Sequence, residues 1–401
     1  MNAVPHNQPT PASRPQKPPK LRVVRFEDHA QIAPLVSRFD LNIESFPGWQ
    51  HLWSDNPAYR EIQDKFPMGW VLENAEGAVC GYLGNVPLDY ELGGKKLLAA
   101  TTRAWVVDTP YRSYSPLLLG TYFQQKNVDL FLSTTVNAQS APAYSIFEGI
   151  PVPRGAWDRT LFWITNYQGF MQSYFRQKGS GMAQALSYPL SVGLFLRDQI
   201  KRSRIAANRG IEVRSCSAFD ERFDSFWEAL RRKNSKILLA VRTREALAWH
   251  FKNSLQQNTA WIYTIENAGG ISAYAVFQRS DYRQIGLTRM RLVDFQCLDQ
   301  ERAPEMLKAM LDAASNRCRK ESIHMLEFVG PNPEVERWLE DTSPHGRPLS
   351  AWLYFYKAGN AALGQTLKNP EIWEPSLFDG DRKSTRLNSS HLRTSRMPSS
   401  A

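Results

Sequence analysis

The apolar positions of residues 21–165 follow the period of a strand in some stretches and that of a helix in others. Residues 21–26 alternate apolar and basic side chains, which predicts a strand, and the apolar residues of 29–39 recur at helical spacing. Further strands are predicted at 69–73, 79–88, 96–107, 129–135 and 160–165, and a short helix at 141–147. This alternation predicts a mixed α/β fold.

The same order of elements returns after residue 210. The pattern predicts strands at 211–215, 261–266, 272–279, 287–295, 322–329 and 352–357, and helices at 219–232, 243–253, 303–317 and 332–339. We therefore predict a tandem duplication of one α/β (α+β sandwich) domain, at 21–165 and 211–380. Each copy should hold a mixed, mostly antiparallel sheet flanked by helices.

Three segments fall outside the two predicted domains. Residues 1–20 are polar and rich in proline, which predicts a disordered N-terminus. Residues 166–210 are interpreted as a helical, basic connector. Its stretch 185–209 combines apolar with basic side chains, so contact with an anionic membrane surface is a less favoured alternative. Residues 381–401 resemble a translated sequencing-library adapter, and we expect this tail to be an artefact.

Net charge and cysteine content indicate which ligands, metal sites and disulfides to expect. Without the five basic residues and one acidic residue of the tail, the net charge falls from +10 to +6. A mild positive balance suits phosphorylated or acyl-carrier ligands and gives no argument for nucleic acid. The four cysteines are far apart, so neither a metal site nor a disulfide framework is expected. No apolar leader or spanning segment stands out, and we expect a cytoplasmic protein.

The clearest candidate for chemistry is the turn after the strand that ends at Val107. Asp108, Thr109 and Pro110 end the strand, and Arg112 follows in the turn. Ser115 is a suitable helix N-cap, with Pro116 at the first helical position. The free N–H groups and the positive dipole end of such a helix would attract a phosphate or pyrophosphate.

This strand, turn and helix resemble the acyl-CoA-binding segment of the GNAT acyltransferase superfamily. The family loop has the form Arg/Gln-x-x-Gly-x-Gly/Ala. Arg112 matches its first position, whereas Ser115 and Leu117 stand where the family has small residues. The resemblance implies acyl-CoA as the donor. Its pyrophosphate would contact Arg112, Ser113, Tyr114, Ser115 and Leu117, and its pantetheine arm would pair with the backbone of Val106 and Val107.

A second resemblance lies in the helix after the predicted fifth strand. The family pattern Asn-x-x-Ala-x-x-x-Tyr-x-x-x-Gly-Phe is matched here by Asn137, Ser140, Tyr144 and then Gly149, one position late. The resemblance implies catalytic positions at Asn137 and Tyr144, with Tyr144 as the acid for the leaving thiolate. The base is not identified, because residues 96–107 contain no carboxylate.

The second copy lacks most of these features. Asp294 could serve as a carboxylate base, but residues 295–304 offer neither the arginine pattern nor the glycines, and Leu339 occupies the place of Tyr144. We therefore expect this copy to support the acceptor site or the fold. His250 and His324 are expected to be structural.

The resemblance as a whole implies a bacterial, tandem GNAT-like N-acyltransferase without a metal. The acceptor would be a small-molecule amine of the amino sugar or amino acid type. Two alternatives remain open at this point. One is a Fem-type transferase that takes its acyl group from aminoacyl-tRNA, and the other is a non-catalytic binding or scaffold protein that keeps the doubled fold.

Overall fold

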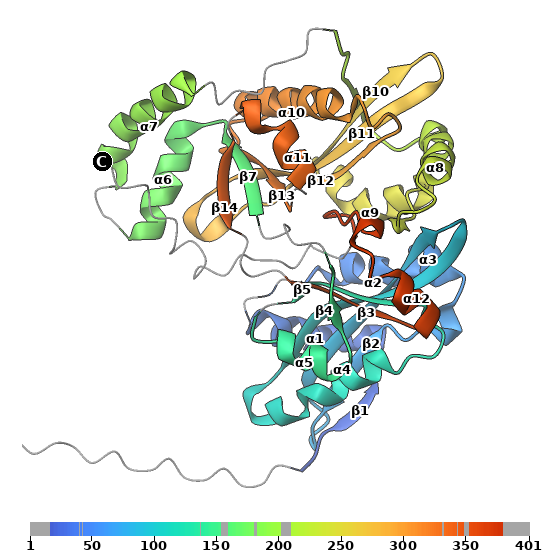
Figure 1. The fold of residues 1–401 in the computed structure, drawn as a ribbon. Helices are drawn as coiled ribbons and strands as arrows, with labels where there is room; N and C mark the ends of the chain where they lie inside the picture. The colour runs from blue at the N-terminus through green and yellow to red at the C-terminus, as the bar shows by residue number, and fades with distance from the viewer. Residues whose placement is uncertain are drawn as a thin grey trace, which may run out of the picture.

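The chain folds around two β-sheets with helices on their faces (Figure 1). The computed structural model describes residues 17–39, 41, 43–136, 138–153, 159–179, 183–201, 210–330, 333–342, 344–348 and 353–379. The expectations for the N-terminal residues 1–16 and for the tail 381–401 lie outside the described residues.

The first sheet is built mainly from the N-terminal part of the chain. Its order is β1 (Lys20–Val23), β2 (Gly69–Glu73), β3 (Val79–Leu92), β4 (Lys95–Val107), β5 (Leu130–Val136), β15 (Leu353–Ala358) and β6 (Ile150–Pro151). A short strand, β9 (Leu239–Ala240), pairs with β3 at its far end. Only the β4–β5 pair is parallel among these neighbours.

The second sheet repeats this arrangement. Its order, from the opposite end, is β8 (Arg214–Cys216), β10 (Ala260–Asn267), β11 (Gly270–Arg279), β12 (Arg289–Cys297), β13 (Met325–Val329), β7 (Arg159–Ile164) and β14 (His345–Pro348). Its parallel pair is β12–β13, in the place that β4–β5 takes in the first sheet. The predicted fold class, two mixed and mostly antiparallel sheets flanked by helices, is confirmed.

Two strands are exchanged between the sheets, which the sequence did not predict. The segment expected to close the first domain, β7, pairs with β13 in the second sheet. The segment expected to close the second domain, β15, pairs with β5 in the first sheet. The assignment of these strands to their own halves is therefore wrong. A free antiparallel edge accepts any strand of suitable alternation, so distance along the chain does not fix the partner.

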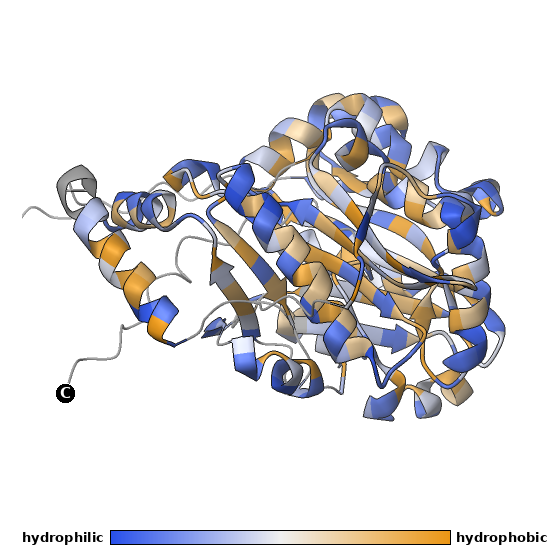
Figure 2. Cartoon of the chain, turned by 90° about the horizontal axis from the view of Figure 1, so that it is seen from above, coloured by the Kyte–Doolittle hydropathy of each residue, from blue (hydrophilic) through white to orange (hydrophobic). Residues whose placement is uncertain are grey.

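Helices cover the faces of both sheets. They are α1 (His29–Ser37), α2 (Phe46–Ser54), α3 (Pro57–Arg60), α4 (Ser115–Phe123), α5 (Ala141–Ile146), α6 (Tyr167–Lys178), α7 (Ala183–Ile200), α8 (Glu221–Lys233), α9 (Arg244–Gln256), α10 (Ala303–Lys320), α11 (Pro333–Trp338) and α12 (Ala361–Thr366). Helix α8 shows why the pattern is readable: Phe223, Phe226 and Leu230 recur at helical spacing and are all buried. Hydropathy along the ribbon confirms this inward orientation for the helices over the sheets (Figure 2).

One hydrophobic core is shared by the two sheets. It joins Tyr90 and Leu130 of the first sheet with Phe223 and Phe251 of helices over the second. Trp373, near the end of the described chain, lies in the same core, and its indole N–H donates to the Leu367 carbonyl over 2.8 Å. The C-terminal segment therefore ties the halves together.

The predicted connector is helical where the structure describes it. Helices α6 and α7 pack side by side at one edge of the second sheet (Figure 1). Residues 202–209, which hold most of the basic run, lie outside the described residues. In the described part of the chain, no helix has both the length and the apolar character needed to cross a bilayer.

Candidate active site in the first sheet

Strands β4 and β5 separate along their length. They pair at Ala99–Leu130, Ala100–Phe131 and Thr101–Leu132, and no pair follows although both strands continue. Beyond this point the backbone edge of β4 that faces β5 has no ladder partner in the described sheet. A β-bulge in β4 accompanies the separation, with Ala104 at φ 48°.

Hydroxyl groups occupy the point where the strands part. The Tyr122 hydroxyl donates to the Ala100 carbonyl over 2.6 Å and lies 3.2 Å from the Leu132 amide nitrogen, so it links both strands. One residue further, the Thr102 and Ser133 hydroxyl oxygens lie 2.8 Å apart. These side chains hold the opening at a fixed width.

Tyr144 lies at this opening. Burial raises the pKa of its phenol, and hydrogen bonds with Ser133 and Thr102 lower it in part. The ring packs edge-on against Trp105, with ring centroids 5.8 Å apart. It also packs against Phe355 of β15 in a tilted arrangement, with ring centroids 5.4 Å apart. The exchanged strand thus supplies one wall of the Tyr144 pocket. The other candidate, Asn137, lies outside the described residues.

The predicted phosphate turn is more ordered than an open loop. Residues 109–114 form a 3-10 helix that leads directly into α4, and the Ser115 N–H already donates to the Arg112 carbonyl. Ser115 is the first residue of α4, not its N-cap, so the predicted cap is one residue too late. Of the expected contacts, Arg112, Ser113 and Leu117 are exposed, whereas Tyr114 and Ser115 are partly covered.

Arg112 is the most available group in this turn. Among the described residues its guanidinium makes no hydrogen bond or ion pair. Val106 and Val107, by contrast, are buried and pair with Tyr82 and Gly81 of β3. Their other backbone edge faces the opening between β4 and β5. The structure therefore brings Val106, Val107 and Tyr144 to one opening and leaves Arg112 at its outer end.

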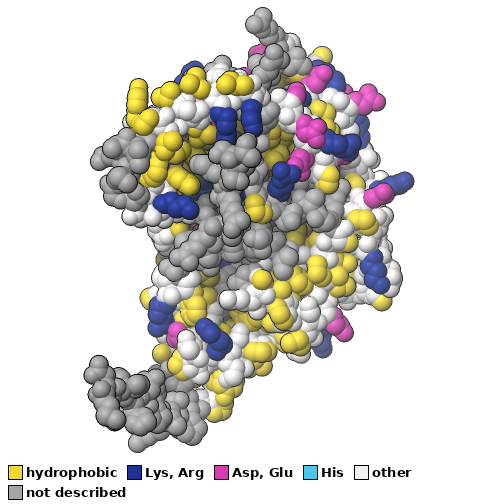
Figure 3. All heavy atoms as spheres, turned by 60° about the vertical axis from the view of Figure 1, so that its left-hand side comes forward, with side chains coloured by type: hydrophobic (Ala, Val, Ile, Leu, Met, Phe, Trp, Pro, Cys, Tyr) yellow, Lys and Arg dark blue, Asp and Glu magenta, His cyan; other side chains and the backbone are white. Residues whose placement is uncertain are grey.

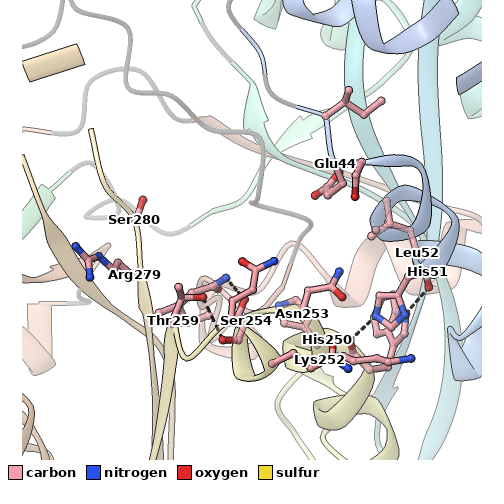
Figure 4. A pocket seen from close by; sticks show the side chains of 18 of the residues that line it. Glu44, His51, Leu52, His250, Lys252, Asn253, Ser254, Thr259, Arg279 and Ser280 are labelled. Atoms are coloured by element: carbon pink, nitrogen blue, oxygen red, sulfur yellow. Dashed lines mark hydrogen bonds between the residues drawn. The ribbon is translucent and has the colours of Figure 1, made fainter. Parts of the chain in front are cut away.

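A large cleft lies on the other side of the first sheet, between the two halves. Its volume is about 1130 Å³, and its walls come from the α2 region, from α9 and from the ends of β11 and β12. Thr101 of β4 lines it, next to the hydroxyl pair at the opening. Figure 4 shows Glu44 on one wall, with Arg279 and Ser280 on the opposite wall.

The two facing helices are bonded to each other across the cleft floor. The Trp249 indole N–H donates to the His51 carbonyl over 3.1 Å, and His51 Nε2 lies 2.9 Å from the Trp249 carbonyl oxygen. His51 Nδ1 lies 2.7 Å from Asp55. Both ring nitrogens of His51 are thus engaged, so this side chain holds α2 to α9. Sequence reasoning did not single out His51.

Each sheet has an ion pair between a strand residue and a residue two positions before a helix, and the charges of the two partners are exchanged between the sheets. Glu44, two residues before α2, pairs with Arg103 of β4. Arg242, two residues before α9, holds Asp294 of β12, with Nε–Oδ2 2.9 Å and NH2–Oδ1 3.0 Å. The expectation that Asp294 might act as a base does not suit this geometry, because both of its oxygens are committed. Glu44 is one of three carboxylate residues that line the cleft, with Asp55 and Asp281, and sequence reasoning did not single it out.

The remaining predicted groups have structural surroundings. His250 lies at the cleft and packs against Phe378, with ring centroids 4.6 Å apart. His324 Nδ1 accepts from the Thr288 amide over 3.3 Å, and burial lowers its pKa. Among the described residues there is no group of three or more His, Cys, Asp or Glu side chains that could hold a metal ion.

Comparison with known proteins identifies the fold. No family model matches the sequence, and no curated protein is significantly similar to it. Among solved structures, Saccharomyces cerevisiae N-myristoyltransferase with bound myristoyl-CoA is similar at 14% identity and TM-score 0.56, covering 90% of each chain. A GCN5-related N-acetyltransferase from Anabaena variabilis is similar at 12% identity and TM-score 0.50, covering 85% of this chain and 73% of its own.

A probable N-acyltransferase from Enterococcus faecalis is similar at 9% identity and TM-score 0.52, covering 87% of this chain and 73% of its own. All three identities are low, so these similarities concern the fold. The chain has the mixed α/β fold of GNAT-like acyltransferases over most of its length.

Proposed function

We propose that this protein is an N-acyltransferase that moves an acyl group from acyl-CoA to an amine, and that the first sheet carries the chemistry. The observation that supports this most directly is the opening between β4 and β5 with the Tyr144 phenol beside it. A thioester placed in the opening would lie beside the phenol and next to the cleft. The fold similarity to acyltransferases points to the same reaction.

The donor would enter along the unpaired edge of β4. Backbone groups of Val106 and Val107 on that edge suit the amides of the pantetheine arm, which would extend the sheet like an added strand. Arg112, exposed at the outer end, would contact the pyrophosphate. With the Ser115 N–H already bonded, this contact relies on the guanidinium and on Ser113 and Tyr114.

Tyr144 would supply the proton for the leaving thiolate. Because burial raises its pKa, the phenol is protonated at neutral pH and able to donate. The acceptor amine would arrive from the cleft, where Thr101 marks the shortest route to the opening. Glu44 lines the same cleft, but its carboxylate already pairs with Arg103, so the group that takes the proton of the amine is not assigned.

A non-catalytic binding protein is the second candidate, and one observation favours it. The Tyr144 ring lies against Trp105, Phe123 and Phe355 as a core aromatic residue would. A hydrolysis and transfer assay with acetyl-CoA and long-chain acyl-CoA, which measures release of the free thiol with a panel of amines, separates the two functions. Thiol release that requires an amine supports the transferase, and its absence with every amine supports a binding protein.

Thermal unfolding with added ligand tests donor choice without knowledge of the acceptor. A ligand that binds only the native state raises the melting temperature. CoA and acyl-CoA should do so, whereas tRNA should not. A shift with aminoacyl-tRNA alone would contradict acyl-CoA as the donor and favour the Fem-type alternative.

A further inference from the structure

Three guanidinium groups surround one carboxylate in the second sheet. Glu327 of β13 is fully buried and contacts Arg291 of β12, Arg347 NH2 of β14 at 2.8 Å and Arg289 NH1 of β12 at 3.4 Å. Three arginines and one glutamate give this cluster a net charge of +2. The neighbouring Asp281 is paired with the Arg279 side chain at 2.9 Å and does not remove the excess.

The excess charge faces the cleft. Arg289 and Arg291 both line it, since alternate residues of β12 point to the same side. Arg289 is 3% exposed, and its Nε donates to the Ser280 carbonyl over 2.7 Å. Among the described residues, its second terminal nitrogen has no hydrogen-bond partner. A guanidinium buried to this degree normally has acceptors for its donors.

The pKa shifts of Arg289 and Glu327 favour an anion-binding site at this cluster. The pKa of Arg289 is lowered to about 9, mainly by burial; the charges of Arg291 and Arg347 contribute to this lowering, and the charge of Glu327 opposes it. Burial alone would raise the pKa of Glu327, but Arg291, Arg289 and Arg347 hold it at about 2. One carboxylate is therefore shared among three cations, and a second anion would stabilise the charged form of Arg289.

We infer that the β11–β12 wall of the cleft is an anion subsite, in which Arg289 and Arg291 bind a carboxylate or phosphate group of the acceptor. This inference rests on the proposed function, in which the amine of the same acceptor reacts at the opening between β4 and β5. Glu44, which pairs with Arg103 of β4, lies on the opposite wall (Figure 4). The cleft would thus align a molecule that carries an amine at one end and an anion at the other.

Calorimetric titration of the full-length protein with inorganic phosphate, and separately with acetate, tests the subsite without any transfer assay. Both titrations use chloride buffer at matched ionic strength. The anion that binds identifies the source of the group. Arg289→Gln should weaken that binding by about tenfold or more, because it removes a charged hydrogen-bond donor. Arg319→Gln, an equal charge change at the exposed end of α10, should leave it unchanged.

Arg289→Lys covers the case in which Arg289→Gln does not fold. It keeps the charge and loses the planar fork, so a smaller weakening is expected. The inference is overturned if neither anion binds the wild-type protein, or if the Arg289 variants bind as the wild type does. Failure of the proposed function looks different: anion binding would persist, but no amine would release thiol from acyl-CoA.

A different part of the molecule carries a second inference. Helix α7 turns a polar face inward and an apolar face outward. Ser187, Ser191 and Asp198 are buried, and Tyr167 of α6 donates to Asp198 Oδ2 over 3.1 Å. The outward stripe recurs at helical spacing and consists of Tyr188, Val192, Phe195, Leu196 and Ile200, with Ile200 83% exposed.

The exposed charged side chains of the described parts of α6 and α7 are all positive, although Arg197 pairs with the buried Asp198 at 3.0 Å. Lys178, Arg197 and Lys201 are exposed, and the single acidic residue of the described hairpin, Asp198, is buried. The sequence continues with further arginines at 202, 204 and 209. Figure 3 brings this side of the molecule forward and shows hydrophobic side chains grouped near Lys and Arg side chains.

The geometry points to an anionic lipid surface as the occupant of this face. An apolar stripe flanked by cations, with no exposed carboxylate on the described residues of α6 and α7, matches the interface of an acidic membrane. The exposed stripe is also continuous along the helix, so all of it can touch a flat surface at once.

Sedimentation with vesicles tests this contact. The protein should sediment with phosphatidylglycerol vesicles and not with phosphatidylcholine vesicles, and added salt should release it. The double variant Leu196→Glu, Ile200→Glu should lose about tenfold or more of the binding. Ile146→Glu on α5, a residue 75% exposed in the first half, is the matched control and should bind as the wild type.

Two results would overturn the lipid assignment. One is equal sedimentation of the double variant and the wild type. The other is concentration-dependent dimerisation without lipid, measured by analytical ultracentrifugation and abolished by the double variant. That result would make the α7 face a dimer interface.

Discussion

Arg242 holds both carboxylate oxygens of Asp294 inside the shared core, at 2.9 and 3.0 Å. Tyr274 donates to the same carboxylate over 2.7 Å. In the first sheet, Arg103 pairs with Glu44. An Arg–carboxylate pair thus occurs in both sheets, with the strand supplying the arginine in the first sheet and the carboxylate in the second.

Asp294→Asn should destabilise the fold by about 3–5 kcal/mol, because it leaves the Arg242 charge buried without its partner. Chemical denaturation measures this change. Glu321→Gln, which breaks the exposed Arg317–Glu321 pair, should cost less than about 1 kcal/mol. Similar losses of unfolding free energy in the two variants would contradict a larger contribution of the buried pair.

Tyr144→Phe should lower kcat by about a hundredfold and leave the affinity for acyl-CoA unchanged, since an acid acts on the transition state. Steady-state thiol release and a separate binding titration measure the two quantities. Tyr122→Phe is the informative comparison, because its hydroxyl bonds the backbone of both strands. We expect that change to reduce stability. Unfolding of the domain by Tyr144→Phe would instead favour a purely structural role.

Arg112→Ala should weaken CoA binding by about tenfold or more, because a charge-assisted contact to the pyrophosphate is lost. Isothermal calorimetry with CoA measures it, and pantetheine, which lacks the pyrophosphate, should bind the variant and the wild type equally. Arg232→Ala, an exposed arginine on α8, serves as the control. Unchanged CoA affinity in Arg112→Ala would place the pyrophosphate elsewhere.

Stability should fall in acid partly through Glu327. Its pKa in the fold is about 2 against 4.5 for a free carboxyl group, so the carboxylate contributes stability above pH 4.5. This contribution is lost progressively as the pH falls from about 4.5 to 2. Glu327→Gln should be less stable at neutral pH and should show a shallower decline over that window. An identical decline in both proteins would assign the acid sensitivity to other groups.

Truncation after Asp379 should leave the melting temperature unchanged, as expected for an artefactual tail. Truncation after Asn369 should be strongly destabilising, because it removes Trp373, Leu377 and Phe378 from the shared core. Burial of a tryptophan alone is worth about 3–5 kcal/mol against alanine. A loss of stability in the longer truncation would show that residues beyond Asp379 belong to the fold.

The sequence by itself determined most local elements and the position of Tyr144. Helix α8, the hairpin β10–β11 and the strand ending at Val107 lie close to their predicted ranges, since a period of 2 or 3.6 is visible within a short window. Tyr144 was singled out by the resemblance of its segment to the GNAT family pattern. Its catalytic role and that of Arg112 stay predictions.

Tertiary structure alone decided the exchange of β7 and β15, the cleft and the arginine cluster. Strand pairing depends on which edges meet in space, and no window of sequence records that choice. Arg289 and Arg291 did leave a signal, as positive charges at alternate positions of a predicted strand. Their common partner Glu327 comes from a neighbouring strand, so the excess charge becomes visible only after the sheet has formed.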